Sequence, residues 1–171
     1  MRMNRNPLGR VLAVDLRADR IGYAAFDSPE RLLDYGTSRF DSGEIGRARA
    51  EFLLRALAPS VIVLRRLRTR STRKHPRGTA NRRVVEAVAK QLNVPLAFVA
   101  ERAIKALFTE FNCRNKFQVA VILGTWFPEL GRYVPRARKC YEPEPWTMAY
   151  FDAIGLGVAY FMLKTDAATT I

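Results

Sequence analysis

Histidine and cysteine are scarce in this chain of 171 residues, which contains one histidine, His75, and two cysteines, Cys113 and Cys140. Two cysteines cannot build a disulfide framework or a four-cysteine zinc site. A single histidine leaves little room for histidine-based catalysis. Any metal chemistry must therefore use carboxylates, which favour Mg²⁺ or Mn²⁺.

Long apolar runs are absent as well. No stretch approaches the roughly 18 uncharged apolar residues that a membrane span requires, and the basic start of the chain lacks the apolar segment of a secretory signal. We expect no membrane partner, a cytoplasmic location, and a basic tail over residues 1–9. Because 49% of the residues are hydrophobic, the chain can build a sizeable core, and one domain over residues 10–164 is predicted.

Acidic residues are outnumbered: 16 Asp and Glu stand against 29 Lys and Arg, a net charge of +13. No acid occurs from residue 52 to 85, and 9 of the 19 residues from 65 to 83 are Lys or Arg. We interpret this segment as an exposed loop that binds a polyanion, most simply nucleic acid. The cations expected to contact it are Arg65, Arg66, Arg68, Arg70, Arg73, Lys74 and Arg77, joined by Arg136, Arg138 and Lys139 from a later loop.

The hydrophobic pattern predicts an α/β domain. Short apolar runs at 11–15, 21–26 and 31–40 indicate three strands joined by tight turns, an antiparallel meander. Further strands are expected at 60–64 and 96–99, and helical spacing appears at 42–58, 79–92, 101–111, 114–130 and 148–164. The last seven residues, 165–171, are expected to fray as a C-terminal tail. This order predicts a mixed sheet with helices on both faces.

Two acids stand out from their apolar surroundings. Asp15 closes the run Val11-Leu-Ala-Val-Asp15, where a strand end presents its side chain at the edge of the sheet. Asp152 lies in a nearly apolar helical stretch, where a lone acid is costly unless it is paired, hydrogen-bonded or bound to a metal. The simpler alternatives are a turn-forming Asp15 and an Asp152 favoured by the helix dipole.

Together these segments resemble the RuvC-like Holliday-junction resolvases of the RNase H-like superfamily. The first acidic strand is followed by Ile21-Gly-Tyr-Ala-Ala-Phe26, similar to the family's second strand, and Asp152-Ala-Ile-Gly-Leu-Gly is similar to its last motif. Lys105 and Lys116 match the family's lysines ahead of a long helix. The resemblance implies an RNase H-like fold with a mixed five-stranded sheet, in which an antiparallel three-strand meander adjoins parallel strands and helices cover both faces.

The resemblance also implies a two-metal nuclease site, which this sequence carries in degenerate form. Asp15 and Asp152 match two of the family's four metal ligands and would be the catalytic pair, with Mg²⁺ or Mn²⁺ as cofactor if the protein is active. Arg65 and Ala149 stand where the other two acids are expected, and Leu16-Arg17 replaces the usual Pro-Gly. The acids that could substitute for the missing ligands are Asp19, Glu101, Glu142 and Glu144.

We therefore interpret the chain as a nucleic-acid-binding protein, for branched or structured DNA rather than RNA, with weak or lost nuclease activity. Two alternatives remain: an active Mg²⁺-dependent structure-specific endonuclease, and a non-catalytic RNA-binding or assembly protein. The resemblance implies a homodimer. It also predicts that Asp15 and Asp152 lie within roughly 10 Å of each other, with Arg65 adjacent.

Overall fold

A five-stranded mixed sheet forms the centre of the computed structural model, which describes residues 8–66, 75–139 and 141–169. Strands β1 (Val11–Leu16), β2 (Arg20–Ser28) and β3 (Arg31–Arg39) form an antiparallel meander. Strands β4 (Val61–Arg66) and β5 (Leu96–Ala100) continue the sheet parallel to β1, in the order β3-β2-β1-β4-β5. The predicted meander with added parallel strands is confirmed.

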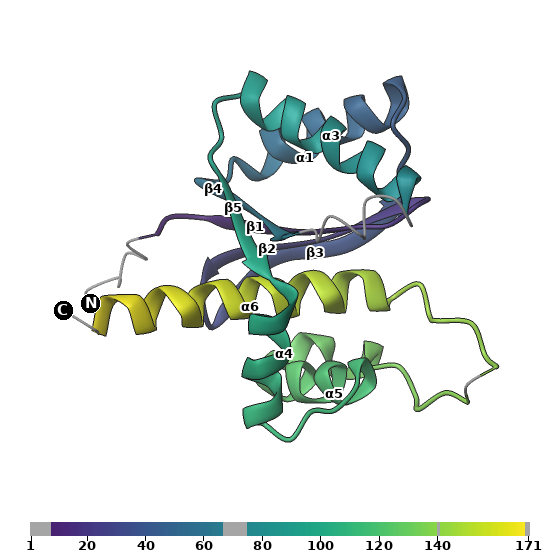
Figure 1. Ribbon diagram of the computed structural model, residues 1–171, viewed down its shortest axis with the longest axis vertical. Helices are drawn as coiled ribbons and strands as arrows, with labels where there is room; N and C mark the ends of the chain where they lie inside the picture. The colour runs from purple at the N-terminus through teal and green to yellow at the C-terminus, as the bar shows by residue number, and fades with distance from the viewer. Residues whose placement is uncertain (1–7, 67–74, 140, 170–171) are drawn as a thin grey trace.

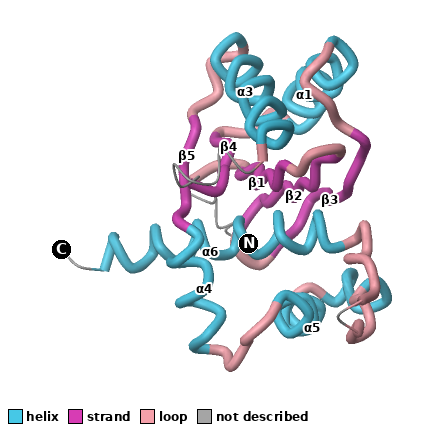
Figure 2. Tube along the Cα trace, turned by 45° about the vertical axis from the view of Figure 1, so that its right-hand side comes forward, coloured by secondary structure: helices cyan, strands magenta, loops and turns pink. Residues whose placement is uncertain are grey.

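Helices cover both faces of this sheet, as Figure 1 shows. Helices α1 (Glu44–Leu57) and α3 (Pro76–Gln91) pack on one face, and α6 (Met148–Thr169) packs on the other. Helices α4 (Glu101–Glu110) and α5 (Lys116–Trp126) lie beyond α6 on that side, as Figure 2 also shows. The four apolar residues that open β1 alternate between the two cores: Val11 and Ala13 face α6, and Leu12 and Val14 face α1 and α3. A strand buried on both faces therefore has a continuous apolar run rather than an alternating one.

Helix α6 lies directly on the sheet because two glycines allow a close approach. A Cβ atom on Gly22 of β2 would lie 2.1 Å from the carbonyl oxygen of Ala149, and a Cβ on Gly157 of α6 would lie 2.2 Å from the ring of Phe26. Gly22 is paired with Asp15 across the β1–β2 ladder. The start of α6 is thus held beside the end of β1.

Three helix boundaries differ from the prediction. The helix expected at 114–130 ends at Trp126, because Phe127 takes an extended conformation before Pro128, and a 3₁₀ turn, η1 (Pro128–Tyr133), follows. Helix α3 begins at Pro76, inside the segment interpreted as a loop, since proline suits the first helical position. Helix α6 continues to Thr169, past the expected end at 164.

Other predictions fall partly outside the described residues. These include most of the basic tail and the centre of the basic segment with Arg68, Arg70, Arg73 and Lys74. Among the helices that the structure does describe, none combines the length and the hydropathy that crossing a lipid bilayer requires.

Candidate functional site

The carboxyl ends of β1 and β4 meet at one edge of the sheet because these strands are parallel neighbours. Asp15 lies near the end of β1, Arg65 near the end of β4, and Asp152 in the second turn of α6. Both carboxylates contact a single guanidinium group, that of Arg17, and Arg65 lies beside Asp15. The predicted juxtaposition of Asp15, Asp152 and Arg65 is therefore present in the structure.

Arg17 is the centre of this cluster. Its Nε lies 3.1 Å from Oδ2 of Asp15, its Nη2 2.8 Å from Oδ2 of Asp152, and its Nη1 2.5 Å from Oε2 of Glu144. Three carboxylates from β1, α6 and the loop before α6 thus share one planar cation, whose donors point in fixed directions. The side chains of Arg17, Asp15 and Asp152 are 22%, 13% and 12% exposed, so water screens these pairs only in part.

Two further cations complete the cluster. Nζ of Lys116, at the start of α5, lies 2.9 Å from Oδ2 of Asp152 and 3.1 Å from Oε1 of Glu144. Nη2 of Arg65 lies 3.7 Å from Oδ1 of Asp15. Three carboxylates therefore face three cations, and the six charges cancel. This "six-charge cluster" consists of Asp15, Arg17, Arg65, Lys116, Glu144 and Asp152.

The protonation equilibria follow from this arrangement. Burial and the negative charge of Asp152 raise the pKa of Asp15, although Arg65 and Arg17 act against them. Burial also opposes the charged forms of Arg17 and Lys116, but the neighbouring carboxylates outweigh it and raise the pKa of both cations. Burial opposes the ionised form of Glu144 as well, but Lys116 and Arg17 prevail and lower its pKa. The carboxylates thus favour the charged forms of Arg17 and Lys116, and these cations favour the ionised form of Glu144, whereas burial favours the protonated form of Asp15.

A buried asparagine fixes the turn that carries Arg17. Nδ2 of Asn81, on α3, donates to the carbonyl oxygens of Arg17 at 2.8 Å and of Ala18 at 3.3 Å. The Asn81 side chain is 1% exposed. Its amide therefore joins α3 to the backbone of this turn, and it positions the turn relative to the sheet.

Replacing Asn81 with leucine should lower the free energy of unfolding by about 1–3 kcal/mol, because the two hydrogen bonds to the carbonyls of Arg17 and Ala18 are lost. Urea unfolding of the purified variant measures this loss. Lys90→Leu is the matched control, since Lys90 is an exposed residue of the same helix. Equal stability of the two leucine variants would show that the Asn81 amide contributes nothing to the turn.

The carboxylates do not fit the metal site that the resemblance implies. Within the described parts of the chain, no group of three or more His, Cys, Asp or Glu side chains is arranged to hold a metal ion. Asp15, Glu144 and Asp152 are spread around a guanidinium rather than around a common point. Ala149, where the fourth acid is expected, is fully buried, and its Cβ faces Gly22. A longer acidic side chain has little room there.

The predicted binding residues that the structure describes line adjoining depressions around the cluster. A cleft of about 610 Å³ adjoins the cluster and includes Arg65, Arg66 and Arg77. A neighbouring groove of about 450 Å³ is lined by Lys116 and by the predicted loop cations Arg136, Arg138 and Lys139. Lys105 is not part of the cluster; it pairs with Glu101 at 2.9 Å on α4.

The sequence interpretation assigned no contact to Arg17 and left the substitute acid open. Of the four acids considered, Glu144 joins the cluster. Glu142 instead accepts a hydrogen bond from the backbone nitrogen of Lys139 at 2.9 Å, and Asp19 pairs with Arg20 at 3.5 Å. The departure from Pro-Gly after Asp15 was the one signal in the sequence that could have indicated that Arg17 belongs to the site.

No protein-family model matches the sequence, and neither does any curated protein. The structure, in contrast, is similar to solved Holliday-junction resolvases. RuvC of Thermus thermophilus, solved in complex with a Holliday-junction substrate, is 15% identical, with a TM-score of 0.65 over 92% of this chain and 96% of that one. The yeast mitochondrial resolvase Ydc2 is 12% identical, with a TM-score of 0.61 over 95% and 83%.

A fowlpox virus Holliday-junction resolvase is 13% identical, with a TM-score of 0.55 over 91% of this chain and 99% of that one. The likeness extends over nearly the whole chain in each comparison. The chain therefore has the RuvC-like, RNase H-like fold that its motifs predicted.

Proposed function

We propose that this chain, with its RuvC-like fold, binds branched or structured DNA and has weak or lost nuclease activity. The observation that carries the proposal is the position of Arg17, which lies between three carboxylates at the edge where the resemblance implies metals. Two-metal hydrolysis requires negative charge at this edge, which Arg17 offsets, whereas DNA phosphates are bound by the cations around it.

Binding is supported by the cations around the cleft and groove. Arg66, Arg77, Arg136, Arg138 and Lys139 are exposed on the sides of these depressions. The chain as a whole has a net charge of +13. Because one of the compared structures contains a Holliday junction, DNA is favoured over RNA as the partner. A homodimer and a cytoplasmic location rest on the sequence interpretation alone and remain proposals.

Weak or lost cleavage is supported by the charge balance of the six-charge cluster. A divalent cation at this edge would have to displace Arg17 or Lys116 from the carboxylates. It would also gain little from a group of charges that already sums to zero. Mg²⁺ gives up its water reluctantly and needs anionic ligands in a near-octahedral arrangement, which this set does not provide.

A four-way DNA junction with one labelled strand tests both halves of the proposal. We expect salt-sensitive binding in a gel-shift assay and no cleavage above background in Mg²⁺ or Mn²⁺. Asp15→Asn is the control, because a working nuclease would lose its activity on this change. Cleavage by the wild type that Asp15→Asn abolishes would establish the alternative, a metal-dependent endonuclease.

A further inference from the structure

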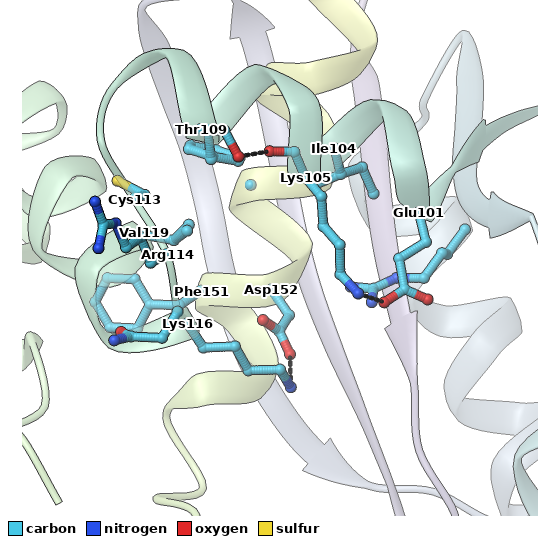
Figure 3. Close-up of a pocket in the computed structure, with 14 residues that line it drawn as sticks. Glu101, Ile104, Lys105, Thr109, Cys113, Arg114, Lys116, Val119, Phe151 and Asp152 are labelled. Carbon is cyan, nitrogen blue, oxygen red and sulfur yellow. Dashed lines mark hydrogen bonds and ion pairs between the residues drawn. The ribbon is translucent and has the colours of Figure 1, made fainter.

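A third depression lies beside the six-charge cluster, between α4, α5 and α6 (Figure 3). Its volume is about 280 Å³, and it shares Arg65, Glu101, Lys116 and Asp152 with the cleft. Figure 3 shows Asp152 between the side chains of Lys105 and Lys116. We call this depression the "α4–α6 pocket".

The interior of the α4–α6 pocket is apolar and firmly packed. Its apolar lining includes Ile104, Phe108, Val119 and Phe151. Phe108 and Phe151 are each 1% exposed, and the Phe108 ring stacks on Trp126 with their centroids 6.2 Å apart. Aromatic rings held in this way form a rigid apolar surface.

A glycine leaves space in this interior. A Cβ atom added to Gly155 of α6 would lie 3.4 Å from Cε2 of Phe108 and 3.7 Å from Cγ1 of Val119. These are ordinary contact distances, so alanine would fit at Gly155 and would fill part of the pocket. The volume therefore depends in part on the absence of one methyl group.

The rim of the pocket, in contrast, is cationic. Lys105, Arg114 and Lys116 are exposed and come from α4, the α4–α5 turn and the start of α5. Lys105 also pairs with Glu101, and Lys116 with Asp152. An apolar interior with a cationic rim suits a ligand that combines a flat apolar ring with a negative charge.

We propose that the α4–α6 pocket receives one unpaired nucleobase of the DNA bound in the adjoining cleft, with the flanking phosphates on Lys105, Arg114 and Lys116. The inference rests on the proposed DNA binding. A base has two apolar faces and is joined to phosphates, so it matches both parts of the pocket. The volume lies near the lower end of the range of about 300–1,000 Å³ for ligand pockets, which favours a single ring system over a longer segment. Base stacking is interrupted where the strands of branched DNA exchange, so a base can leave its pair there at a lower cost than within a continuous duplex.

Filling the pocket without changing its charge isolates the contribution of the base. We would replace Ile104 with tryptophan and use Val121→Trp as the matched control, because Val121 is an exposed β-branched residue of α5 that does not line the pocket.

The probe is a four-way junction that carries 2-aminopurine next to the exchange point. The fluorescence of this base analogue rises when it is unstacked. Circular dichroism verifies that each variant folds. Gly155→Ala serves as a second, milder filling variant, with exposed Gly131→Ala as its control.

The wild type and Val121→Trp should raise the 2-aminopurine fluorescence on binding, and Ile104→Trp should abolish the rise. Ile104→Trp should also weaken binding about tenfold, in line with one lost base contact, and leave the salt dependence unchanged because no charge is altered. Gly155→Ala should reduce the fluorescence rise, and Gly131→Ala should not.

Two results would overturn the pocket assignment while leaving DNA binding intact. The first is unchanged fluorescence and affinity in both filling variants that still fold. The second is a change of sedimentation coefficient in DNA-free Ile104→Trp but not in Val121→Trp, which would indicate that a second copy of the chain covers the pocket. Failure of the wild type to bind the junction at any salt concentration would instead overturn the proposed function, and the pocket assignment with it.

Discussion

Replacing Arg17 with methionine is expected to lower the free energy of unfolding by about 3 kcal/mol at neutral pH, because breaking a largely buried ion pair leaves uncompensated charge behind. Arg17 contacts Asp15, Glu144 and Asp152 at once. Methionine retains much of the apolar stem and removes only the cation. The three carboxylates then repel one another, with Lys116 and Arg65 as their remaining partners in the cluster.

The loss should shrink as the pH falls. Asp15 has a raised pKa, so the folded state holds its proton more tightly than the unfolded chain does, and protonation favours folding as the pH falls toward 3.8, its usual value. Removing Arg17, which acts to lower that pKa, strengthens this effect in the variant. Glu144 behaves oppositely in the wild type: its lowered pKa stabilises the fold above its usual value of 4.5, and this contribution is lost in acid. Both effects reduce the difference in the free energy of unfolding between the wild type and Arg17→Met at low pH.

Urea unfolding at neutral and at acidic pH measures this prediction, with Arg66→Met as the control. Arg66 is an exposed arginine at the end of β4, and its loss should matter little. Adding Asp15→Asn to Arg17→Met should restore part of the stability, since it removes one of the three carboxylates that repel one another. If Arg17→Met is no less stable than Arg66→Met, the cluster contributes nothing to the fold.

The sheet was predictable from local signals, and the meeting of Asp15 and Asp152 was predicted from the resemblance. The runs that open β1 and β4 are uninterrupted apolar segments of strand length, and their parallel pairing brings Asp15 and Arg65 to one edge. The helix that carries Asp152 was predicted over 148–164, without any indication of how closely it packs on the sheet. The structure explains why this helix lies so near, because Gly22 leaves room for the backbone of Ala149.

The parts that Arg17 and Glu144 have in the cluster could not be predicted from local signals. Arg17 lies in a turn of charged residues, where a side chain normally points to solvent, and its direction depends on the Asn81 contacts from a helix 64 positions later in the sequence. Glu142 and Glu144 are two residues apart in a proline-rich loop with no periodicity. Nothing local distinguishes the acid that binds the loop backbone from the acid that reaches the cluster.

The basic segment, residues 65–83, shows that composition is a poor guide to secondary structure. Its composition indicated an exposed loop, yet residues 76–83 belong to α3. A dense run of arginines does not prevent a helix, because arginine has a high helix propensity and Pro76 can begin one. Charge alone thus did not predict the local structure of these residues.

Neutralising Arg68, Arg70, Arg73 and Lys74 to glutamine should cause the largest loss of DNA affinity. These residues lie outside the described part of the chain, and the expectation rests on their charge and on their place between Arg66 and His75, which line the cleft. Each phosphate contact adds about 0.9 to the slope of log affinity against log salt. Four lost contacts therefore flatten that slope by up to about 3.6, so that the wild type's advantage is about 100-fold larger at 50 mM than at 200 mM salt.

Fluorescence anisotropy of a labelled junction across this salt range gives both slopes. The matched control is a second quadruple variant with the same loss of charge, Arg31, Arg39, Arg47 and Arg55 to glutamine, on β3 and α1. Its slope should stay near that of the wild type, because these arginines lie away from the cleft and are not expected to contact phosphates. An equal flattening of the slope in both variants would mean that the affinity for DNA depends only on the total charge of the protein. An unchanged slope in the variant of residues 68, 70, 73 and 74 would place the binding face elsewhere. A difference between the two slopes is what ties DNA binding to the sheet edge that carries Arg17.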